Sequence, residues 1–398
     1  MKTVVLLGDG MGDFPVEKLG NRTPLQAAHA PTIRQIAAAG EVRMVSTVPD
    51  GLPPGSDVAN MAILGYDAAL NYTGRAPIEA AGADLPMASD DVAFRCNLVT
   101  VQEGTMVDYS AGHISTEEAA ELIHALQNEL GAAGLDFHVG VQYRHLLIWK
   151  NGAADAGCIP PHEISDQAVE PHLPKGSGSE AIRLLMERSK TILAEHPVNQ
   201  QRVAEGKAPA TQIWLWGQGR SMQLDSYQHL YGLGGGIVSA VDLLKGLAKL
   251  AGLKAPDVVG ATGLIDTNYA GKVAAAKEIL EREDFAYVHI EAPDECGHLG
   301  DATLKTEAIE RFDAHVCAPM LEWLEARGEP YQIVLTMDHR TPVALKGHCS
   351  DPVPMAHLRG PVGAFDAEAS FDEEVNNGVS QGMACAWMQE ILNSAAAT

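Results

Sequence analysis

The sequence predicts an α/β protein built on buried parallel strands. Apolar runs of strand length, at residues 3–7, 286–291 and 333–335, alternate along the chain with segments of helical pattern. Hydrophobic residues make up 46% of the chain and glycines number 39, as in a globular α/β protein rather than a disordered chain. Each of the three runs leads into a loop with acidic or imidazole side chains. Such loops border the ligand crevice of an open α/β sheet, so we expect the functional site there.

The first expected strand, at 3–7, ends in a carboxylate between two glycines. Gly8 and Gly10 let other groups approach the backbone, and Asp9 between them is placed as a ligand of a divalent cation at the sheet edge. An aspartate that only shapes a turn is the alternative. A helical run that follows Pro24 and ends at Gly40 comes next.

After a short strand at 43–48, a proline and glycine turn delivers Ser56 to the start of a helix. A helix N-terminus offers free N–H groups and a favourable dipole, which suit a serine nucleophile or a bound phosphoryl group. Ser56 as a helix N-cap is the simpler interpretation, and both can hold together. Arg75 lies on the next loop and suits an anionic group.

The pattern changes between about 91 and 172 to short strands and helices. A strand at 94–99, a capped helix from Ser115 to 130 and two further strands form a βαββ pattern. We expect a small inserted α+β domain at 91–172, acting as a lid, and a core formed by 1–90 and 173–398. The core would resume with a helix at 179–195 and a strand at 212–216.

Nucleotide-binding signatures are missing from the chain. No GxGxxG follows a strand in the right register and no GxxxxGK[ST] occurs, which disfavours a Rossmann cofactor site and a P-loop.

Two late loops carry the other candidate ligands. Asp294 and His298 stand four residues apart, so on a helical turn both side chains point the same way. Asp338 and His339 directly follow the strand at 333–335, and His348 lies nine residues beyond His339. Each residue alone is more simply structural.

Together these residues predict a two-metal site. Three carboxylates, three imidazoles and one hydroxyl suit two divalent ions, with imidazole favouring manganese or zinc over magnesium. The seven predicted ligands are Asp9, Ser56, Asp294, His298, Asp338, His339 and His348.

Net charge restricts the partners. The chain has 52 acidic and 28 basic residues and a formal net charge of −24, which repels nucleic acid and anionic lipid. No apolar run approaches bilayer length, and the six scattered cysteines include no CxxC pair. We expect a soluble cytoplasmic protein with reduced thiols and a small-molecule substrate, without a nucleic-acid or membrane partner.

Several stretches resemble the archaeal-type cofactor-independent phosphoglycerate mutases, a branch of the alkaline phosphatase superfamily. The resemblance runs through nearly the whole chain and includes GDGMGD, PPGSDVANMAILGYD, YTGRAPIEAAG, FRCNLVT, HPVN, ATGLIDTNYAGK, EAPDECGHLGD and DHRTP…H…DPVP. It implies a mostly parallel sheet between helix layers, an inserted smaller domain and two metals. Ser56 would be the nucleophile that becomes phosphoserine, with the metals lowering its pKa and neutralising the phosphoryl oxygens.

The resemblance also assigns ligand sets and substrate contacts. Asp9, Ser56, Asp338 and His339 would bind one metal, and Asp294, His298 and His348 the other. The substrate-binding residues would be Arg75, Arg95, Asp108, His113 and Arg340.

One motif departs from the mutase pattern. Mutases of this type carry a motif similar to DRRAGRI, and the corresponding residues 108–114 of this chain read DYSAGHI. Tyr109, Ser110 and His113 therefore replace three arginines. The loss of three guanidinium groups weakens recognition of phosphate and carboxylate. These changes, with Arg340, YRHLLIWK and IWLWGQG, resemble a bacterial subgroup of proposed homoserine kinases. We therefore expect phosphorylation of L-homoserine in threonine biosynthesis, with ATP as donor.

Three alternatives remain. The first is a phosphoglycerate mutase that interconverts 2- and 3-phosphoglycerate. The second is a phosphatase with water as acceptor, recognisable by release of free phosphate. The third is a metal-binding protein without catalysis, for which a serine among the ligands has no use.

Overall fold

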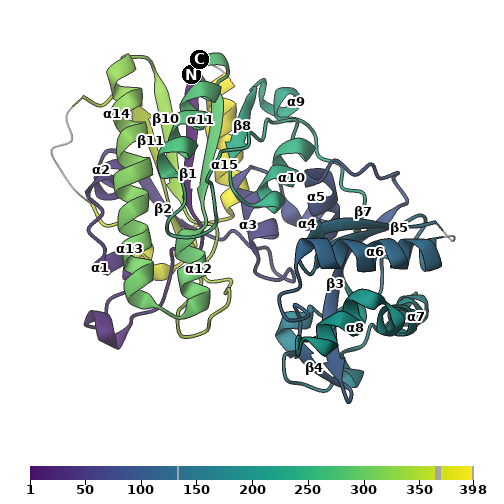
Figure 1. The fold of residues 1–398 in the computed structure, drawn as a ribbon. Helices are drawn as coiled ribbons and strands as arrows, with labels where there is room; N and C mark the ends of the chain where they lie inside the picture. The colour runs from purple at the N-terminus through teal and green to yellow at the C-terminus, as the bar shows by residue number, and fades with distance from the viewer. Residues whose placement is uncertain (132–133, 364–368, 397–398) are drawn as a thin grey trace. The chain divides into compact units, whose positions relative to one another are not determined.

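The computed structural model describes residues 1–131, 134–363 and 369–396 of the chain (Figure 1). It divides into two compact units. The first unit comprises Met1–Tyr72 and Leu224–Thr398, and the second comprises Thr73–Gln223. No helix in the described ranges is long and apolar enough to cross a membrane.

The first unit contains a six-stranded sheet in the order β2-β11-β10-β1-β9-β8. Strands β8, β9, β1 and β10 run parallel, and β11 is antiparallel to both β10 and β2. The fold class expected from the sequence is therefore confirmed as a mostly parallel α/β sheet. The strands span Lys2–Gly8 (β1), Glu41–Val45 (β2), Gly235–Val238 (β8), Phe285–Ile290 (β9), Tyr331–Thr336 (β10) and Val353–Gly360 (β11).

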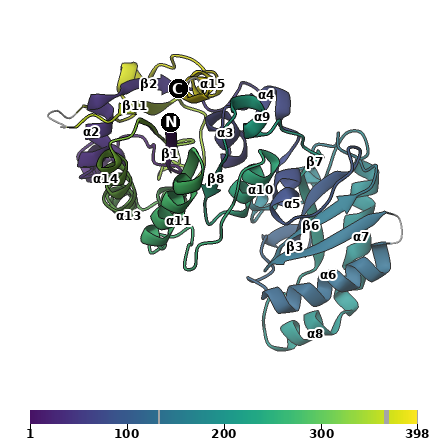
Figure 2. The same cartoon turned by 90° about the horizontal axis from the view of Figure 1, so that it is seen from above.

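Helices cover both faces of this sheet (Figures 1 and 2). The first face carries α2 (Pro31–Ala39), α11 (Tyr269–Arg282), α13 (Ala302–Phe312) and α14 (Ala318–Arg327). The other carries α3 (Ser56–Ile63), α9 (Tyr227–Tyr231), α10 (Asp242–Leu250) and α15 (Ala384–Ala396). Short helices lie at Pro24–Ala27 (α1), Ala68–Asn71 (α4) and Ala292–Leu299 (α12), with 3-10 turns at Glu17–Leu19 and Val375–Gly378 and a π-helical segment at Asp313–Cys317.

The central strand β1 aligns the site-bearing loops. Leu7 pairs with His289 of β9 on one side and with Thr336 of β10 on the other. Because the three strands are parallel and end at the same level, the loops that follow them meet at one edge of the sheet. Val4 to Leu7 are fully buried, as expected for a strand covered on both faces.

The helical run predicted after Pro24 is interrupted. Helix α1 ends at Ala27 and α2 begins at Pro31, because the proline ring disfavours helical backbone at Ala30. The new N-terminus is capped from a distant segment, since the Asp313 carboxylate accepts hydrogen bonds from the backbone N–H groups of Thr32 and Ile33.

The second unit is a mixed α+β domain with β3 at the centre of its sheet. Strand β3 pairs antiparallel with β4, β6 and β7, and β5 pairs with β6. Its strands span Val92–Gln102 (β3), Thr105–Asp108 (β4), Leu135–Val141 (β5), Arg144–Trp149 (β6) and Gln212–Arg220 (β7). Its helices span Arg75–Gly82 (α5), Thr116–Leu130 (α6), Ser179–Glu195 (α7) and Pro197–Ala204 (α8), with 3-10 turns at Pro161–Ile164 and Glu170–His172.

This unit is larger than the insertion expected at 91–172. Strand β7, assigned from the sequence to the main sheet, instead pairs with β3 along Val92–Val99. Helix α7 packs on β7, and α5 packs on β3 and β7. Pairing between strands more than 100 residues apart leaves no trace in local composition, which explains the difference.

Candidate active site

The structure brings the seven predicted residues together at the carboxyl edge of the first unit's sheet. Asp9 follows β1, Asp294 and His298 share α12 after β9, and Asp338 and His339 follow β10. The seven-residue cluster comprises Asp9, Ser56, Asp294, His298, Asp338, His339 and His348.

His339 is central to one half of this cluster. Its Nε2 lies 3.1 Å from Ser56 Oγ, 3.6 Å from Asp9 Oδ1 and 3.4 Å from Asp338 Oδ2. Its ring stacks on that of His348, with 4.0 Å between the ring centroids. His339 thus links the hydroxyl, two carboxylates and the second half of the cluster.

The second half is built around Asp294. Its two carboxylate oxygens lie 3.2 Å from His298 Nε2 and 3.4 Å from His348 Nε2. The two imidazole Nε2 atoms are 3.1 Å apart. Two ring nitrogens and a carboxylate therefore converge on one point.

Each imidazole has an oxygen partner at its other nitrogen. The Nδ1 atoms of His298 and His348 lie 3.0 Å and 3.3 Å from the carbonyl oxygens of Lys346 and Pro54. A carbonyl can only accept, so both Nδ1 atoms carry hydrogen, and in a neutral ring the lone pair lies on Nε2.

His339 follows the same rule through a hydroxyl. Thr341 Oγ1 donates to Asp294 and lies 3.2 Å from His339 Nδ1, so the hydroxyl oxygen accepts from Nδ1–H. The Nε2 lone pair of His339 therefore faces the carboxylates of Asp9 and Asp338.

These donors fit divalent cations. Two groups of ligand atoms lie within 4.8 Å of one another, Asp9 with Asp338 and His339, and Asp294 with His339 and His348. In addition, Asp9 Oδ1 is buried and has no hydrogen-bond partner among the described residues, which is costly unless a cation binds it. The chemistry matches oxygen and imidazole coordination, and His339 lies where the two groups meet.

The pKa shifts in this cluster reflect the same crowding. Burial raises the pKa of Asp9 well above its ordinary value, and the neighbouring carboxylates of Asp338 and Asp294 raise it further. Burial lowers the pKa of His339 to about 4. The hydrogen bond to Asp294 raises the pKa of His298 to about 9, so in the metal-free protein a proton occupies the point between them.

Ser56 is the first residue of α3, and the N-cap position belongs to Gly55. The Ser56 Oγ lies 3.1 Å from His339 Nε2. The simpler interpretation of Ser56 as an N-cap therefore does not describe this residue.

Sequence reasoning missed two residues, Asn60 and Thr341, that hydrogen-bond to members of the cluster. Asn60, one turn after Ser56, donates to the Ser56 carbonyl at 2.8 Å and to Asp338 Oδ2 at 2.9 Å. Its position four residues after Ser56 on the same helix was the available signal. Thr341, in the loop after β10, gave no comparable signal.

A buried ion pair braces the loops that carry the cluster. Lys305 Nζ lies 2.9 Å from Asp13 Oδ2 and donates to the carbonyl oxygens of Gly12 and Thr341, both at 2.8 Å. Lys305 on α13 therefore joins the loop after β1 to the loop after β10.

Comparison with known proteins identifies the family. Residues 37–199 match the family model described as 2,3-bisphosphoglycerate-independent phosphoglycerate mutase. A mutase of that name from Methanosarcina mazei is 50% identical over 380 residues, which cover 95% of this chain and 96% of the relative. A probable mutase from Geobacter sulfurreducens is 49% identical over 378 residues, 94% of each chain. The chain belongs to the 2,3-bisphosphoglycerate-independent phosphoglycerate mutase family.

Solved structures agree with this mutase family. The PH0037 protein from Pyrococcus horikoshii is 27% identical with a TM-score of 0.81, covering 100% of this chain and 97% of that protein. A cofactor-independent phosphoglycerate mutase from Thermoplasma acidophilum is also 27% identical, with a TM-score of 0.65 and full coverage of both chains.

The expectation of a homoserine kinase was wrong. Relatives about 50% identical over most of the chain are named phosphoglycerate mutases, and this finding removes homoserine, threonine biosynthesis and ATP from the interpretation. That expectation rested on the replacement of mutase arginines by Tyr109, Ser110 and His113. These changes affect a single loop, and the agreement with the mutases at about half of all positions outweighs them.

Arg75 and Arg95 of the second unit share one carboxylate. Their Nε atoms each lie 2.9 Å from an oxygen of Glu79, and the Arg95 guanidinium stacks over the Trp216 ring at 4.3 Å. Burial lowers the pKa of Arg95 to about 10, so it remains a cation at neutral pH. Two cations against one anion leave a net positive charge, further increased by Arg144, which acts electrostatically on both Arg95 and Glu79.

The other predicted substrate residues have different surroundings. Asp108 accepts hydrogen bonds from Ser110 and from the backbone of Gly112, which shape its own loop, and His113 is exposed on that loop. Arg340 belongs to the first unit, where its Nε and Nη2 both donate to the Pro352 carbonyl at 3.0 and 2.7 Å. That contact joins Arg340 to the segment before β11.

Proposed function

We propose that this chain is a metal-dependent phosphoglycerate mutase that interconverts 3- and 2-phosphoglycerate through a phosphoserine at Ser56. The observation that carries the proposal is the position of Ser56 Oγ, at the start of α3 and 3.1 Å from His339 Nε2 within a cluster of carboxylates and imidazoles. A hydroxyl at that position can act as the nucleophile of a phosphoryl transfer, whereas a protein that only stores metal has no use for a nucleophile.

The ligand atoms divide between two cations. Asp9, Ser56, Asp338 and His339 would hold one, and Asp294, His298 and His348 the other, with manganese or zinc suited to the imidazoles. When bound, such cations lower the pKa of a serine hydroxyl and neutralise the charge of phosphoryl oxygens.

The chain's own groups position the transfer. Ser56 Oγ gives up its proton and attacks phosphorus, the bond from phosphorus to the substrate oxygen breaks, and the departing glycerate oxygen takes up a proton. The other glycerate hydroxyl then gives up its proton and attacks the phosphoserine, and the released Ser56 oxygen takes up a proton, which restores the hydroxyl. The first backbone N–H groups of α3 suit the phosphoryl oxygens, and Asn60 holds Ser56 against Asp338 during both steps.

We further propose that Arg75 and Arg95 take part in binding the anionic substrate. The Glu79 carboxylate oxygens lie 2.9 Å from the Nε atoms of Arg75 and Arg95. Because both guanidinium groups are already held in place, they lose little side-chain entropy when they bind a carboxylate or phosphate.

The first test is turnover of 3-phosphoglycerate by Ser56→Ala. With manganese present and 2-phosphoglycerate detected by coupled dehydration, we expect turnover to fall by at least about a thousandfold because the nucleophile is gone, while manganese uptake persists. Ser46→Ala is the matched control, since the Ser46 hydroxyl bonds Ser380 and lies outside the cluster. Retained turnover in Ser56→Ala would remove Ser56 from the nucleophile role, and release of free phosphate by the wild type would indicate a phosphatase.

A further inference from the structure

His289, which is not among the predicted metal ligands, lies on strand β9 and contacts Asp9 of the candidate site. His289 is fully buried. Its Nε2 is 2.8 Å from Asp9 Oδ2, and its Nδ1 is 3.1 Å from Ser239 Oγ. Both ring nitrogens therefore have a polar partner.

The hydrogen-bond directions follow from the donors available. The backbone N–H of Val241 donates to Ser239 Oγ at 3.0 Å, which leaves the Ser239 hydroxyl able to donate to His289 Nδ1 or to accept from it through a second lone pair. Asp9 decides between the two. An ionised Asp9, the form that ligates a cation, can only accept, so Nε2–H donates to Oδ2 and Nδ1 of the neutral ring accepts from Ser239.

The contact with His289 gives the two carboxylate oxygens of Asp9 different surroundings. Oδ2 lies 2.8 Å from His289 Nε2, whereas Oδ1 is buried, has no hydrogen-bond partner in the part of the chain that the structure describes, and lies 3.6 Å from His339 Nε2. The carboxylate thus presents a single free oxygen to the other ligand atoms.

We propose that His289 is a positioning residue that fixes Asp9 as a one-oxygen ligand of a divalent cation. The inference rests on the metal centre of the proposed function and adds to it a residue that the ligand sets do not contain. A donor behind a ligating carboxylate sets the orientation of that carboxylate and tunes its strength as a ligand.

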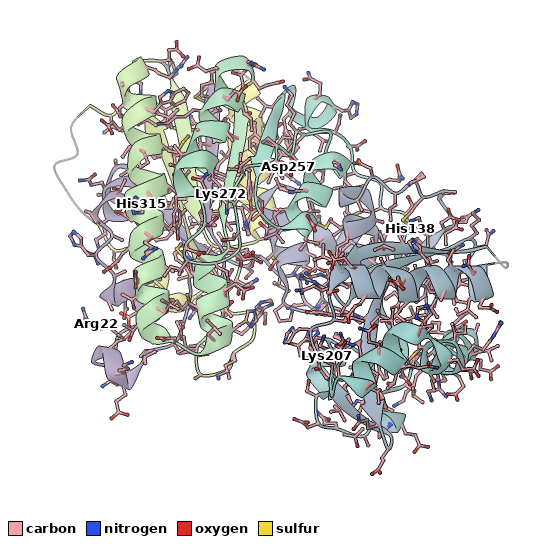
Figure 3. The ribbon with its side chains drawn as sticks, in the orientation of Figure 1. Arg22, His138, Lys207, Asp257, Lys272 and His315 are labelled. Atoms are coloured by element: carbon pink, nitrogen blue, oxygen red, sulfur yellow. The ribbon has the colours of Figure 1, made fainter. Side chains whose placement is uncertain are left out.

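The surroundings of His289 keep its ring in place. Its backbone pairs with Leu7 in the sheet, and its carbonyl oxygen lies 3.3 Å from Nζ of Lys272, a buried lysine of α11 that is labelled in Figure 3. A ring held at its backbone and at both nitrogens cannot turn away from Asp9 without breaking several contacts.

The test compares two substitutions at the same position. His289→Leu keeps most of the volume and removes the donor, whereas His289→Gln retains an N–H near the position of Nε2. Metal-free protein is titrated with Mn²⁺, and free Mn²⁺ is measured by electron paramagnetic resonance. We expect His289→Leu to weaken one of two Mn²⁺ sites by about 10- to 100-fold and His289→Gln to recover most of that loss.

The matched control is His145→Leu, which removes another buried imidazole, in the second unit, and should leave both Mn²⁺ affinities unchanged. Two sites of wild-type affinity in folded His289→Leu would overturn the positioning role while leaving the metal centre intact. A wild-type protein that binds no Mn²⁺ would overturn the metal centre and the positioning role together.

A measurement on the wild type covers the case in which His289→Leu does not fold. The nitrogen spectrum of ¹⁵N-histidine-labelled protein, with His289 assigned from the His289→Gln variant, should show a neutral ring with hydrogen on Nε2. A neutral ring with hydrogen on Nδ1 would overturn the inference, because that tautomer cannot donate to Asp9.

Discussion

At the scale of single residues, hydrogen bonds to one side of an imidazole decide what its other side can do. His298, His348 and His339 each have an oxygen acceptor at Nδ1, and each presents Nε2 to the cluster. His289 is the reverse case, since its Nδ1 accepts from Ser239 and its Nε2 donates to Asp9. The same side chain thus serves as a candidate ligand in three positions and as a support in the fourth.

The buried His145, which lies outside the cluster, should make the free energy of unfolding depend on pH. His145 accepts a hydrogen bond from the Gly140 backbone at Nδ1, and burial lowers its pKa to about 3 from an ordinary value of 6.5. Below pH 6.5 the His145 imidazole binds a proton in the unfolded chain but not in the folded protein. The free energy of unfolding therefore falls as pH drops toward 3. One such group costs about 2 kcal/mol between pH 6.5 and 5.

The check is the free energy of unfolding by urea at pH 7 and pH 5. In His145→Asn an amide oxygen replaces Nδ1 as acceptor and nothing titrates, so the loss of stability between the two pH values should be smaller than in the wild type by about that amount. Equal losses in both proteins would show that His145 does not control this part of the profile.

At the scale of elements, the candidate site depends on loops that join distant helices and strands. Lys305 of α13 reaches Asp13 after β1 and the Thr341 carbonyl after β10. Both members of the ion pair are buried, and the Asp13 carboxylate also accepts from the Val343 backbone. The pair therefore fixes two loops of the cluster relative to one helix.

Loss of one partner of this pair should be costly. Lys305→Met leaves a buried carboxylate without its cation, and we expect a loss of about 3 to 5 kcal/mol in the free energy of unfolding, measured by urea denaturation. Asp257→Asn is the control, because it breaks the pair of Lys245 with Asp257, whose side chain is 90% exposed and is labelled in Figure 3. No measurable change is expected there. Similar stabilities of the two variants would contradict a bracing role for Lys305.

At the scale of the whole molecule, the second unit has the features of a domain that folds alone. It is one continuous stretch, Thr73–Gln223, with a hydrophobic core of its own that includes Phe94, Leu122 and Trp214. Its two ends meet, since Thr73 Oγ1 donates to the Arg220 carbonyl at 2.8 Å. A continuous stretch with a hydrophobic core of its own is the usual form of an independently folding domain.

Two fragments test this independence. Residues 73–223 should give a cooperative thermal unfolding transition by circular dichroism, because the fragment contains every strand that pairs with β3. The fragment 91–172 lacks α5, α7 and β7, so it should unfold without cooperativity. Cooperative unfolding of the shorter fragment alone would favour the boundary expected from local composition.

The sequence by itself determined the fold class, the strands that lead into the site and the family, because these depend on local patterns and short motifs. It also named seven residues that the structure gathers in one cluster, since the carboxyl ends of parallel strands share an edge. Tertiary structure alone decided the extent of the second unit, the contact of Glu79 with Arg95, and the contact of His289 with Asp9. Each of these depends on contacts between different helices and strands, and the spacing of residues along the sequence does not reveal such contacts.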